Sequence, residues 1–247
     1  MKDSHNDKIA SLEQSKPHVS AIIAAAGISS RMEGHGNKQF LLIGGRPVIT
    51  WTLAAFQRAT TIDEVIVVCR SEDIVNVYDI VKYYDFTKVI SVVGGGNTRQ
   101  QSVFAGIKEL RASTDYIAIH DGARPLIRPE TIDAVVTCAF ENKAAITGVP
   151  TVDTIKEVST TGMILRTVDR SRMWNVQTPQ VFARELYFEA MQKADDSRVD
   201  FTDDCQLVEN LKKAVYMVEG SYSNFKITTA QDIALANKII EERESCE

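Results

Sequence analysis

Three short loops carry the residues whose types and spacing could perform chemistry. In the first, Ala25, Ala26 and Gly27 end an apolar run, and the cations Arg31 and Lys38 follow. Small residues let backbone N–H groups approach a phosphate closely, and the cations supply counter-charge. The loop matches neither the GxGxxG dinucleotide pattern nor the GxxxxGK[ST] phosphate loop. By itself it is equally consistent with a flexible turn.

The second loop, His120-Asp121-Gly122-Ala123-Arg124-Pro125, also follows an apolar run. A carboxylate at a strand end is suited to Mg²⁺, which needs one or two such ligands beside phosphates. Arg124 can present a planar fork to a second anion. The alternative is that Asp121 and Arg124 stabilise the turn as a pair. For His120 we favour a buried, satisfied histidine over a catalytic one.

The third loop runs from Gly94 through Gly96, Asn97 and Ser102 into an expected helix. Bare backbone at consecutive glycines allows a flat ligand such as a nucleobase to come close, although an ordinary loop between a strand and a helix would look similar. Five further polar residues form no pattern on their own: Thr154, Arg170, Thr178, Thr202 and Lys226.

Short apolar runs rich in Val and Ile alternate with longer amphipathic ones, which predicts an α/β fold with a mostly parallel sheet. Ligands bind at the carboxyl ends of such strands, where the first two loops lie. The expected strands are 19–25, 64–69, 89–93, 116–120, 144–149 and 214–218. The expected helices lie near 47–56, 103–110, 129–140 and 229–241.

The segment 153–168 breaks this rhythm with two strand-like pieces around Ser159-Thr160-Thr161-Gly162, which predicts a β-hairpin. An isolated hairpin is marginal in water, so we expect this arm, about 151–170, to pack against a second copy of the chain. We treat residues 1–18 as a flexible leader because they are polar and lack periodicity, and residues 19–247 as a single domain.

Composition limits the class of protein. The chain has 247 residues, 28 basic and 33 acidic, for a net charge of −5, which argues against nucleic acid or an anionic membrane as partner. No apolar run reaches the roughly 20 residues of a membrane span. The four cysteines form no CxxC pair, which predicts a reducing compartment and a cytoplasmic protein.

Eight pieces in one order resemble the 2-C-methyl-D-erythritol 4-phosphate cytidylyltransferase family, from Val19 to the end. The pieces are AAAGISSRM, NKQF, GGGNTRQQSV, HDGARP, VDTIK, TVDRSRMWNVQTPQVF, FTDD and FKITTAQD. The resemblance implies a Rossmann-like nucleotidyltransferase fold with a mixed sheet, and a homodimer clasped by hairpin arms. It also implies that CTP and methylerythritol phosphate give CDP-methylerythritol and pyrophosphate, in non-mevalonate isoprenoid biosynthesis.

The same resemblance implies roles for individual residues. Arg31 and Lys38 resemble the triphosphate-binding pair, and Lys226 joins them as a catalytic cation. Asp121 matches the carboxylate that holds Mg²⁺ or another divalent cation. Nucleotide contacts are implied for Ala25, Ala26, Gly27, Gly96, Asn97 and Ser102. Contacts to the polyol phosphate are implied for Asp121, Arg124, Thr154, Thr178, Thr202 and, from the partner subunit, Arg170.

Ser29 stands where many members of the family have glycine, and Asn97 stands where some have an acidic residue. Two rivals remain, a ribitol 5-phosphate cytidylyltransferase and a nucleotide-binding module without catalysis. The pieces TVDRS and Trp174 favour the methylerythritol enzymes over the first, and the complete set of charged positions argues against the second. A dehydrogenase is disfavoured because GxGxxG is missing.

Overall fold

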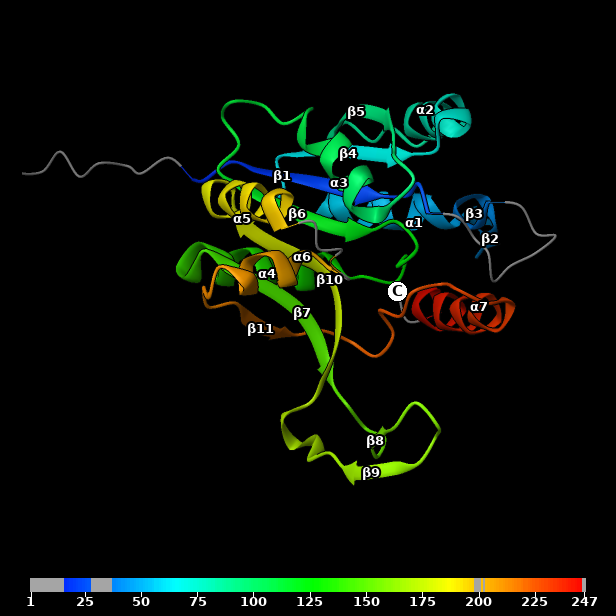
Figure 1. Ribbon diagram of the computed structural model, residues 1–247. Coiled ribbons are helices and arrows are strands. Elements are labelled where there is room, and N and C mark those ends of the chain that lie inside the picture. The colour runs from blue at the N-terminus through cyan, green and yellow to red at the C-terminus, as the bar shows by residue number, and fades with distance from the viewer. Residues whose placement is uncertain (1–15, 28–36, 198–200, 202, 246–247) are drawn as a thin grey trace, which may run out of the picture.

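The computed structural model describes residues 16–27, 37–197, 201 and 203–245. Within these residues seven strands form a central sheet in the order β11-β7-β10-β6-β1-β4-β5, shown in Figure 1. Strand β10 runs antiparallel to β6 and β7, and the other neighbours are parallel. The strands of this sheet are β1 (Val19–Ala24), β4 (Glu64–Cys69), β5 (Val89–Gly94), β6 (Tyr116–Asp121), β7 (Ala144–Pro150), β10 (Trp174–Ala183) and β11 (Tyr216–Glu219).

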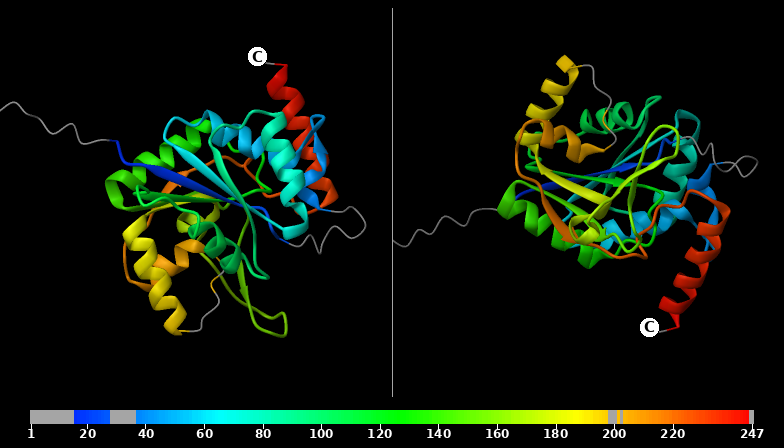
Figure 2. Two further views of the ribbon diagram at one scale, coloured as in Figure 1. Left: turned by 90° about the horizontal axis from the view of Figure 1, so that it is seen from above. Right: turned by 60° about the horizontal axis from the view of Figure 1, so that its bottom comes forward.

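Helices cover both faces of the sheet, as the views in Figures 1 and 2 show. Side chains from α1, α2 and α4 pack on one face, and side chains from α3, α5 and α6 pack on the other. The helices are α1 (Val48–Arg58), α2 (Ile74–Tyr83), α3 (Arg99–Ile107), α4 (Pro129–Asn142), α5 (Arg184–Ser197), α6 (Asp204–Asn210) and α7 (Ala230–Glu244). Short 3₁₀ turns occupy Lys38–Phe40, Ser71–Asp73 and Arg170–Arg172.

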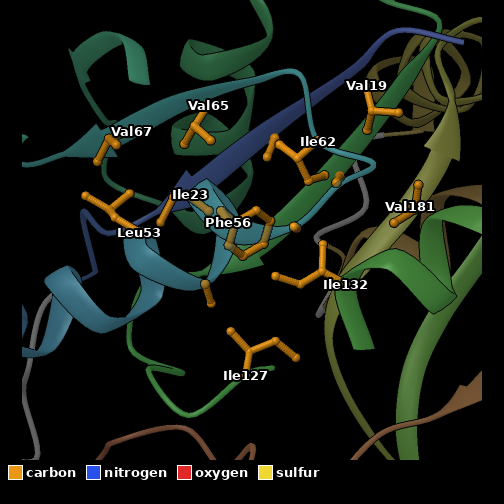
Figure 3. Close-up of a cluster of buried hydrophobic side chains, with 14 of the residues drawn as sticks. Val19, Ile23, Leu53, Phe56, Ile62, Val65, Val67, Ile127, Ile132 and Val181 are labelled. Carbon is orange, nitrogen blue, oxygen red and sulfur yellow. The ribbon is translucent and has the colours of Figure 1, made fainter. Parts of the chain in front are cut away.

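The sheet is apolar on both faces because successive side chains of a strand point to opposite sides. Ile23 of β1 therefore joins Phe56 of α1 and Ile132 of α4 in the cluster of Figure 3. Its neighbour Ile22 packs on the opposite face with Val103 of α3. This double burial explains why the parallel strands read as continuous Val and Ile runs rather than as alternating ones.

The structure confirms the expected α/β class and every expected strand and helix, with ends that shift by a few residues. Strand β10 was not expected, because Gln177, Pro179 and Gln180 interrupt its apolar pattern. Phe104 does not share the buried face of α3, although its neighbour Val103 does. Phe104 is 46% exposed and lies under Lys108, while Ser102, Val103, Gly106 and Ile107 form the buried face.

The hairpin expected at 153–168 is present as β8 (Lys156–Val158) and β9 (Ile164–Thr167). It projects away from the sheet, at the bottom of Figure 1. Every residue of both strands is exposed, including the apolar Val158, Ile164 and Leu165. An exposed hairpin with apolar side chains has little to stabilise it within one subunit.

The two ends of the described chain are both anchored. Near the start, the backbone N–H of His18 donates to Asp115, and the Lys16 ammonium donates to the Thr60 carbonyl. Most of the expected leader lies outside the described residues. Near the end, α7 packs Ala236 and Ile240 against the small β2 (Leu42–Ile43) and β3 (Arg46–Pro47) pair.

Replacing Gly106 by alanine tests the packing of α3 on the sheet. Alanine normally favours a helix interior by about 1 kcal/mol over glycine. Here an added Cβ would lie 2.7 Å from Ile22 Cγ2 and 2.9 Å from Val68 Cγ2. We therefore expect Gly106→Ala to lower the free energy of unfolding by about 1–2 kcal/mol in urea titrations, as overpacked cores do.

Asn76→Ala, at an exposed position of α2, is the matched control and should be neutral or slightly stabilising. An equal effect of the two replacements would contradict close packing of α3 on β1 and β4.

Candidate functional site

A cleft of about 490 Å³ opens at the carboxyl ends of β1, β4, β5 and β6. Its position follows from topology, because the chain leaves β1 to pair β4 on one side and returns to pair β6 on the other. Such a reversal of strand order leaves a crevice between the loops. The lining residues are Ala24, Ala26, Gly27, Lys38, Gln39, Arg70, Ser71, Glu72, Gly95, Gly96, Asn97, Thr98, Arg99, Ser102, Asp121, Ala123 and Lys226.

Asp121 lies on the floor of this cleft, 7% exposed, at the last position of β6. Within the described chain three cations approach its carboxylate: Lys226 Nζ lies 2.9 Å from Oδ2, Arg124 Nε 3.7 Å from Oδ2, and Arg99 Nε 3.4 Å from Oδ1. Burial by itself raises the pKa of Asp121, but Lys226, Arg99 and Arg124 outweigh burial and hold that pKa well below its usual range. The floor of the cleft is therefore a permanent negative charge.

The loop that carries Lys226 is held against the loop that follows Asp121. The Ile227 N–H donates to the Ala123 carbonyl at 2.8 Å, and Arg124 Nη1 donates to the Asn224 carbonyl at 2.8 Å. One N–H group of the Arg124 guanidinium is thus already used in a hydrogen bond to the backbone. Arg124 contributes charge from beside Asp121 and does not itself line the cleft.

A chain of hydrogen bonds supports Asp121 from below. The Asp121 N–H donates to Thr178 Oγ1 at 3.0 Å, and this hydroxyl lies 3.1 Å from His120 Nδ1. His120 Nε2 lies 3.3 Å from the Arg124 carbonyl, which must accept, so Nε2 carries the proton and Nδ1 accepts from Thr178. His120 is fully buried and burial lowers its pKa to about 3. The expectation of a structural histidine is confirmed.

The glycine-rich loop reaches the cleft from β5. A Cβ on Gly95 would lie 2.5 Å from Ala26 Cβ, so the third loop packs against the first only because it is bare there. Thr98 caps α3 in a reciprocal pair with Gln101, and Ser102 Oγ donates to the Thr98 carbonyl at 3.0 Å. These contacts place the Ser102 hydroxyl and the Gly96 backbone on one wall of the cleft.

The structure gathers eight of the residues expected from the sequence around this cleft: Ala26, Gly27, Lys38, Gly96, Asn97, Ser102, Asp121 and Lys226. Ala25 is buried beneath it, with its N–H donated to the Val68 carbonyl, and Thr178 is buried behind Asp121. Thr154 and Arg170 are exposed in the arm, where Arg170 donates to the Val152 carbonyl. Arg31 and Thr202 lie outside the described residues, as does Ser29.

Arg99 and Arg70 line the cleft but were not expected there. Arg99 lies between the glycines 94–96 and Ser102. Its position as the first residue of a helix behind a Gly-rich loop is a signal that could have found it. Arg70 follows β4 directly, at the same sheet edge as Asp121, which is also readable from the sequence.

No group of three or more His, Cys, Asp or Glu side chains among the described residues forms a metal cage. A divalent cation at Asp121 would therefore depend on ligands brought by a phosphate-containing substrate, as is usual for Mg²⁺.

In the described part of the chain, no helix has the length and apolar character needed to cross a membrane.

The buried His120 makes stability depend on pH. Its imidazole stays neutral in the folded protein down to about pH 3, whereas the unfolded chain binds a proton below about pH 6.5. The unfolded chain therefore binds more protons in this window, and the free energy of unfolding falls as pH falls. Between pH 7 and pH 5 the loss attributable to His120 is about 2 kcal/mol.

His120→Gln removes this titration. Urea unfolding at pH 7 and at pH 5 gives the free energy of unfolding of the wild-type chain and of the variant. We expect the difference between the two chains to be smaller at pH 5 than at pH 7 by about 2 kcal/mol. A gap that stays constant would contradict a neutral, buried His120.

Comparisons with known proteins agree with the sequence motifs. The family model described as 2-C-methyl-D-erythritol 4-phosphate cytidylyltransferase matches residues 19–242. Proteins of that name from Syntrophus aciditrophicus and Halalkalibacterium halodurans are 42% and 40% identical to this chain. These matches cover 93% and 91% of this chain and 98% of each relative.

Solved structures show the same fold. The 4-diphosphocytidyl-2C-methyl-D-erythritol synthase of Anaerococcus prevotii superposes with a TM-score of 0.82 at 34% identity, covering 92% of this chain and 97% of that one. The Thermus thermophilus cytidylyltransferase superposes with a TM-score of 0.73 at 32% identity, covering 91% and 99%. The chain therefore belongs to the 2-C-methyl-D-erythritol 4-phosphate cytidylyltransferase family of nucleotidyltransferases.

Proposed function

We propose that this protein joins CTP to 2-C-methyl-D-erythritol 4-phosphate, giving CDP-methylerythritol and pyrophosphate in isoprenoid biosynthesis. The observation that carries the proposal is one cleft with Lys38, Lys226 and Asp121 beside the bare backbone of Gly27 and Gly96. Both substrates are anions, and the cleft concentrates cations in a protein whose net charge is −5.

The walls of the cleft suggest how CTP lies. The base and ribose fit against Gly96, Asn97 and Ser102, where backbone and a hydroxyl supply polar contacts at close range. The triphosphate then runs along Ala26 and Gly27 toward Lys38. The resemblance assigns Arg31 to the same triphosphate, and Arg31 lies outside the described residues. Asn97 in place of an acidic residue offers both a donor and an acceptor to the base.

The chemistry needs charge more than proton transfer. A phosphate monoester oxygen of methylerythritol phosphate attacks the α-phosphorus of CTP, and the bond to the bridging β-oxygen breaks to release pyrophosphate. The attacking group is largely dianionic near neutral pH because its second pKa is about 6, so it needs no general base. Lys38 and Lys226 would align two mutually repelling anions and offset the charge that develops in the transition state.

The donor set at Asp121 suits Mg²⁺ or another divalent cation. A single buried carboxylate beside the phosphate loop supplies the one protein ligand that such an ion needs when phosphates provide the rest. When bound, the ion would neutralise phosphate charge. Lys226, now 2.9 Å from Oδ2 of Asp121, would be free to turn toward the phosphate of the polyol.

A second copy of the chain completes the proposal. Val158, Ile164 and Leu165 expose apolar surface on a projecting hairpin, which a partner would cover. Thr154 and Arg170 lie in this same arm, so a homodimer would deliver them to the polyol phosphate in the partner's cleft. We also place the enzyme in the cytoplasm, consistent with unpaired thiols at Cys69, Cys138 and Cys205.

The decisive experiment supplies CTP and Mg²⁺ with methylerythritol phosphate or ribitol 5-phosphate and measures pyrophosphate release. The proposal requires clear preference for methylerythritol phosphate. A preference for ribitol 5-phosphate would indicate a ribitol 5-phosphate cytidylyltransferase. The absence of pyrophosphate release with either substrate would indicate a nucleotide-binding module without catalysis.

Lys38→Ala should lower kcat by about 10²–10³-fold, because a cation preorganised for transition-state charge is lost. Lys108→Ala, an exposed lysine at the end of α3, is the matched control and should retain the wild-type rate. Near-normal turnover of Lys38→Ala would refute its role.

The cross-subunit assignment is tested by mixing two impaired chains, assayed at a methylerythritol phosphate concentration so far below the KM of the Arg170→Ala chain that this chain alone is nearly inactive. Arg170→Ala should raise KM for methylerythritol phosphate and leave CTP binding unchanged, because Arg170 is expected to contact only the polyol phosphate. When Arg170→Ala and Lys38→Ala chains are unfolded and refolded together, half the dimers are mixed and each has one fully native site. We expect roughly a quarter of wild-type activity to return. No recovery, or a monomer in sedimentation equilibrium, would contradict the shared site.

A further inference from the structure

Arg99 lies between two carboxylates, only one of which faces the cleft. Its Nη1 lies 2.6 Å from Oδ2 of Asp204, and its Nε lies 3.4 Å from Oδ1 of Asp121. Asp204 is the first residue of α6, is 3% exposed and does not line the cleft. The shorter contact is thus to the carboxylate that no substrate can reach.

Asp204 is itself held in place. Its Oδ1 accepts from the Tyr187 hydroxyl at 2.7 Å, and Tyr187 is buried and stacks on Phe182 of β10 with ring centroids 5.2 Å apart. The preceding Asp203 caps α6 and accepts from the Gln180 amide at 3.1 Å. Tyr187 of α5 therefore holds the Asp204 carboxylate directly, and Gln180 of β10 holds the residue before it. Asp204 in turn holds the guanidinium of Arg99.

The two oxygens of Asp121 have different surroundings. Oδ2 faces Lys226 and Arg124, whereas Oδ1 faces Arg99 at a distance longer than an ordinary N–H···O bond. A free arginine closes on a carboxylate with two parallel, short N–H···O bonds. Arg99, held by Asp204, stays at the edge of Asp121 and shares its charge with a second carboxylate.

We propose that Asp204 is a positioning residue that holds Arg99 back from Asp121 and keeps the Oδ1 side of Asp121 available to the divalent cation that accompanies the nucleotide. The inference rests on the proposed function, which assigns that cation to Asp121. Without the Asp204 charge, the Arg99 guanidinium would bind the Asp121 carboxylate directly and occupy Oδ1. Its positive charge, no longer shared with Asp204, would also repel the metal ion, so the metal would bind more weakly.

The test measures CTP affinity by isothermal titration calorimetry with and without Mn²⁺, in the absence of polyol phosphate so that no turnover occurs. The readout is the factor by which Mn²⁺ tightens CTP binding. Asp204→Asn keeps the size of the side chain and an oxygen that accepts from Tyr187, but it removes the charge that holds Arg99. We expect the Mn²⁺ factor to fall about tenfold, the usual scale for residues that orient a metal ligand.

Two further variants separate positioning from a general structural effect. Asp203→Asn makes the same replacement one residue earlier, keeps a helix-capping side chain and does not touch Arg99, so the Mn²⁺ factor should stay at the wild-type value. Asp204→Asn combined with Arg99→Gln removes the cation that closes on Asp121, so the factor should recover most of what Asp204→Asn lost.

Asp121→Asn tells the two hypotheses apart. If it abolishes the Mn²⁺ factor while Asp204→Asn leaves that factor intact, the metal assignment stands and the positioning inference is overturned. If Asp204→Asn lowers the factor but the double variant does not recover it, Asp204 does not act through Arg99 and the inference fails. If Asp121→Asn leaves the factor unchanged, the metal assignment fails and the inference fails with it.

Discussion

The site depends on an ionised carboxylate that is buried at the end of a central strand. A lone buried carboxylate would take up a proton, since desolvation disfavours its charged form. Asp121 remains ionised because Lys226, Arg99 and Arg124 approach it from three separate segments of the chain. These segments must be brought together before the charge is tolerated, so the fold and the electrostatics of the cleft depend on each other.

The hydrogen bonds around β6 show how the fold meets this requirement. The antiparallel β10 lies beside β6 and carries Thr178, whose hydroxyl joins the backbone of Asp121 to a neutral His120. The imidazole then reaches the carbonyl of Arg124, which closes the loop around Asp121. The histidine next to Asp121 thus serves packing and geometry. This agrees with a reaction whose nucleophile arrives already deprotonated.

The same cleft explains how an acidic protein can act on two anions. Acidic residues outnumber basic ones in the whole chain, whereas four cations line this cleft: Lys38, Arg70, Arg99 and Lys226. Their charge is balanced unevenly, because the Asp204 carboxylate is buried beside Arg99 outside the cleft, whereas Asp121 and Glu72 line it. On the proposed function, a divalent cation and a phosphate would therefore find partners of opposite charge in the same cleft.

The amino-acid sequence by itself determined the fold class, the parallel strands, the arm and the loops that hold Lys38, Asp121 and Gly96. These features depend on local patterns: runs of β-branched residues, helical periodicity, turn residues, and glycines where the backbone can approach a neighbour closely. Tertiary structure alone decided that β10 runs antiparallel through an interrupted pattern, that Thr178 supports Asp121 from behind, and that Asp204 holds Arg99. Each of these joins residues far apart in the chain, and no local pattern records which distant side chain will neutralise a buried charge.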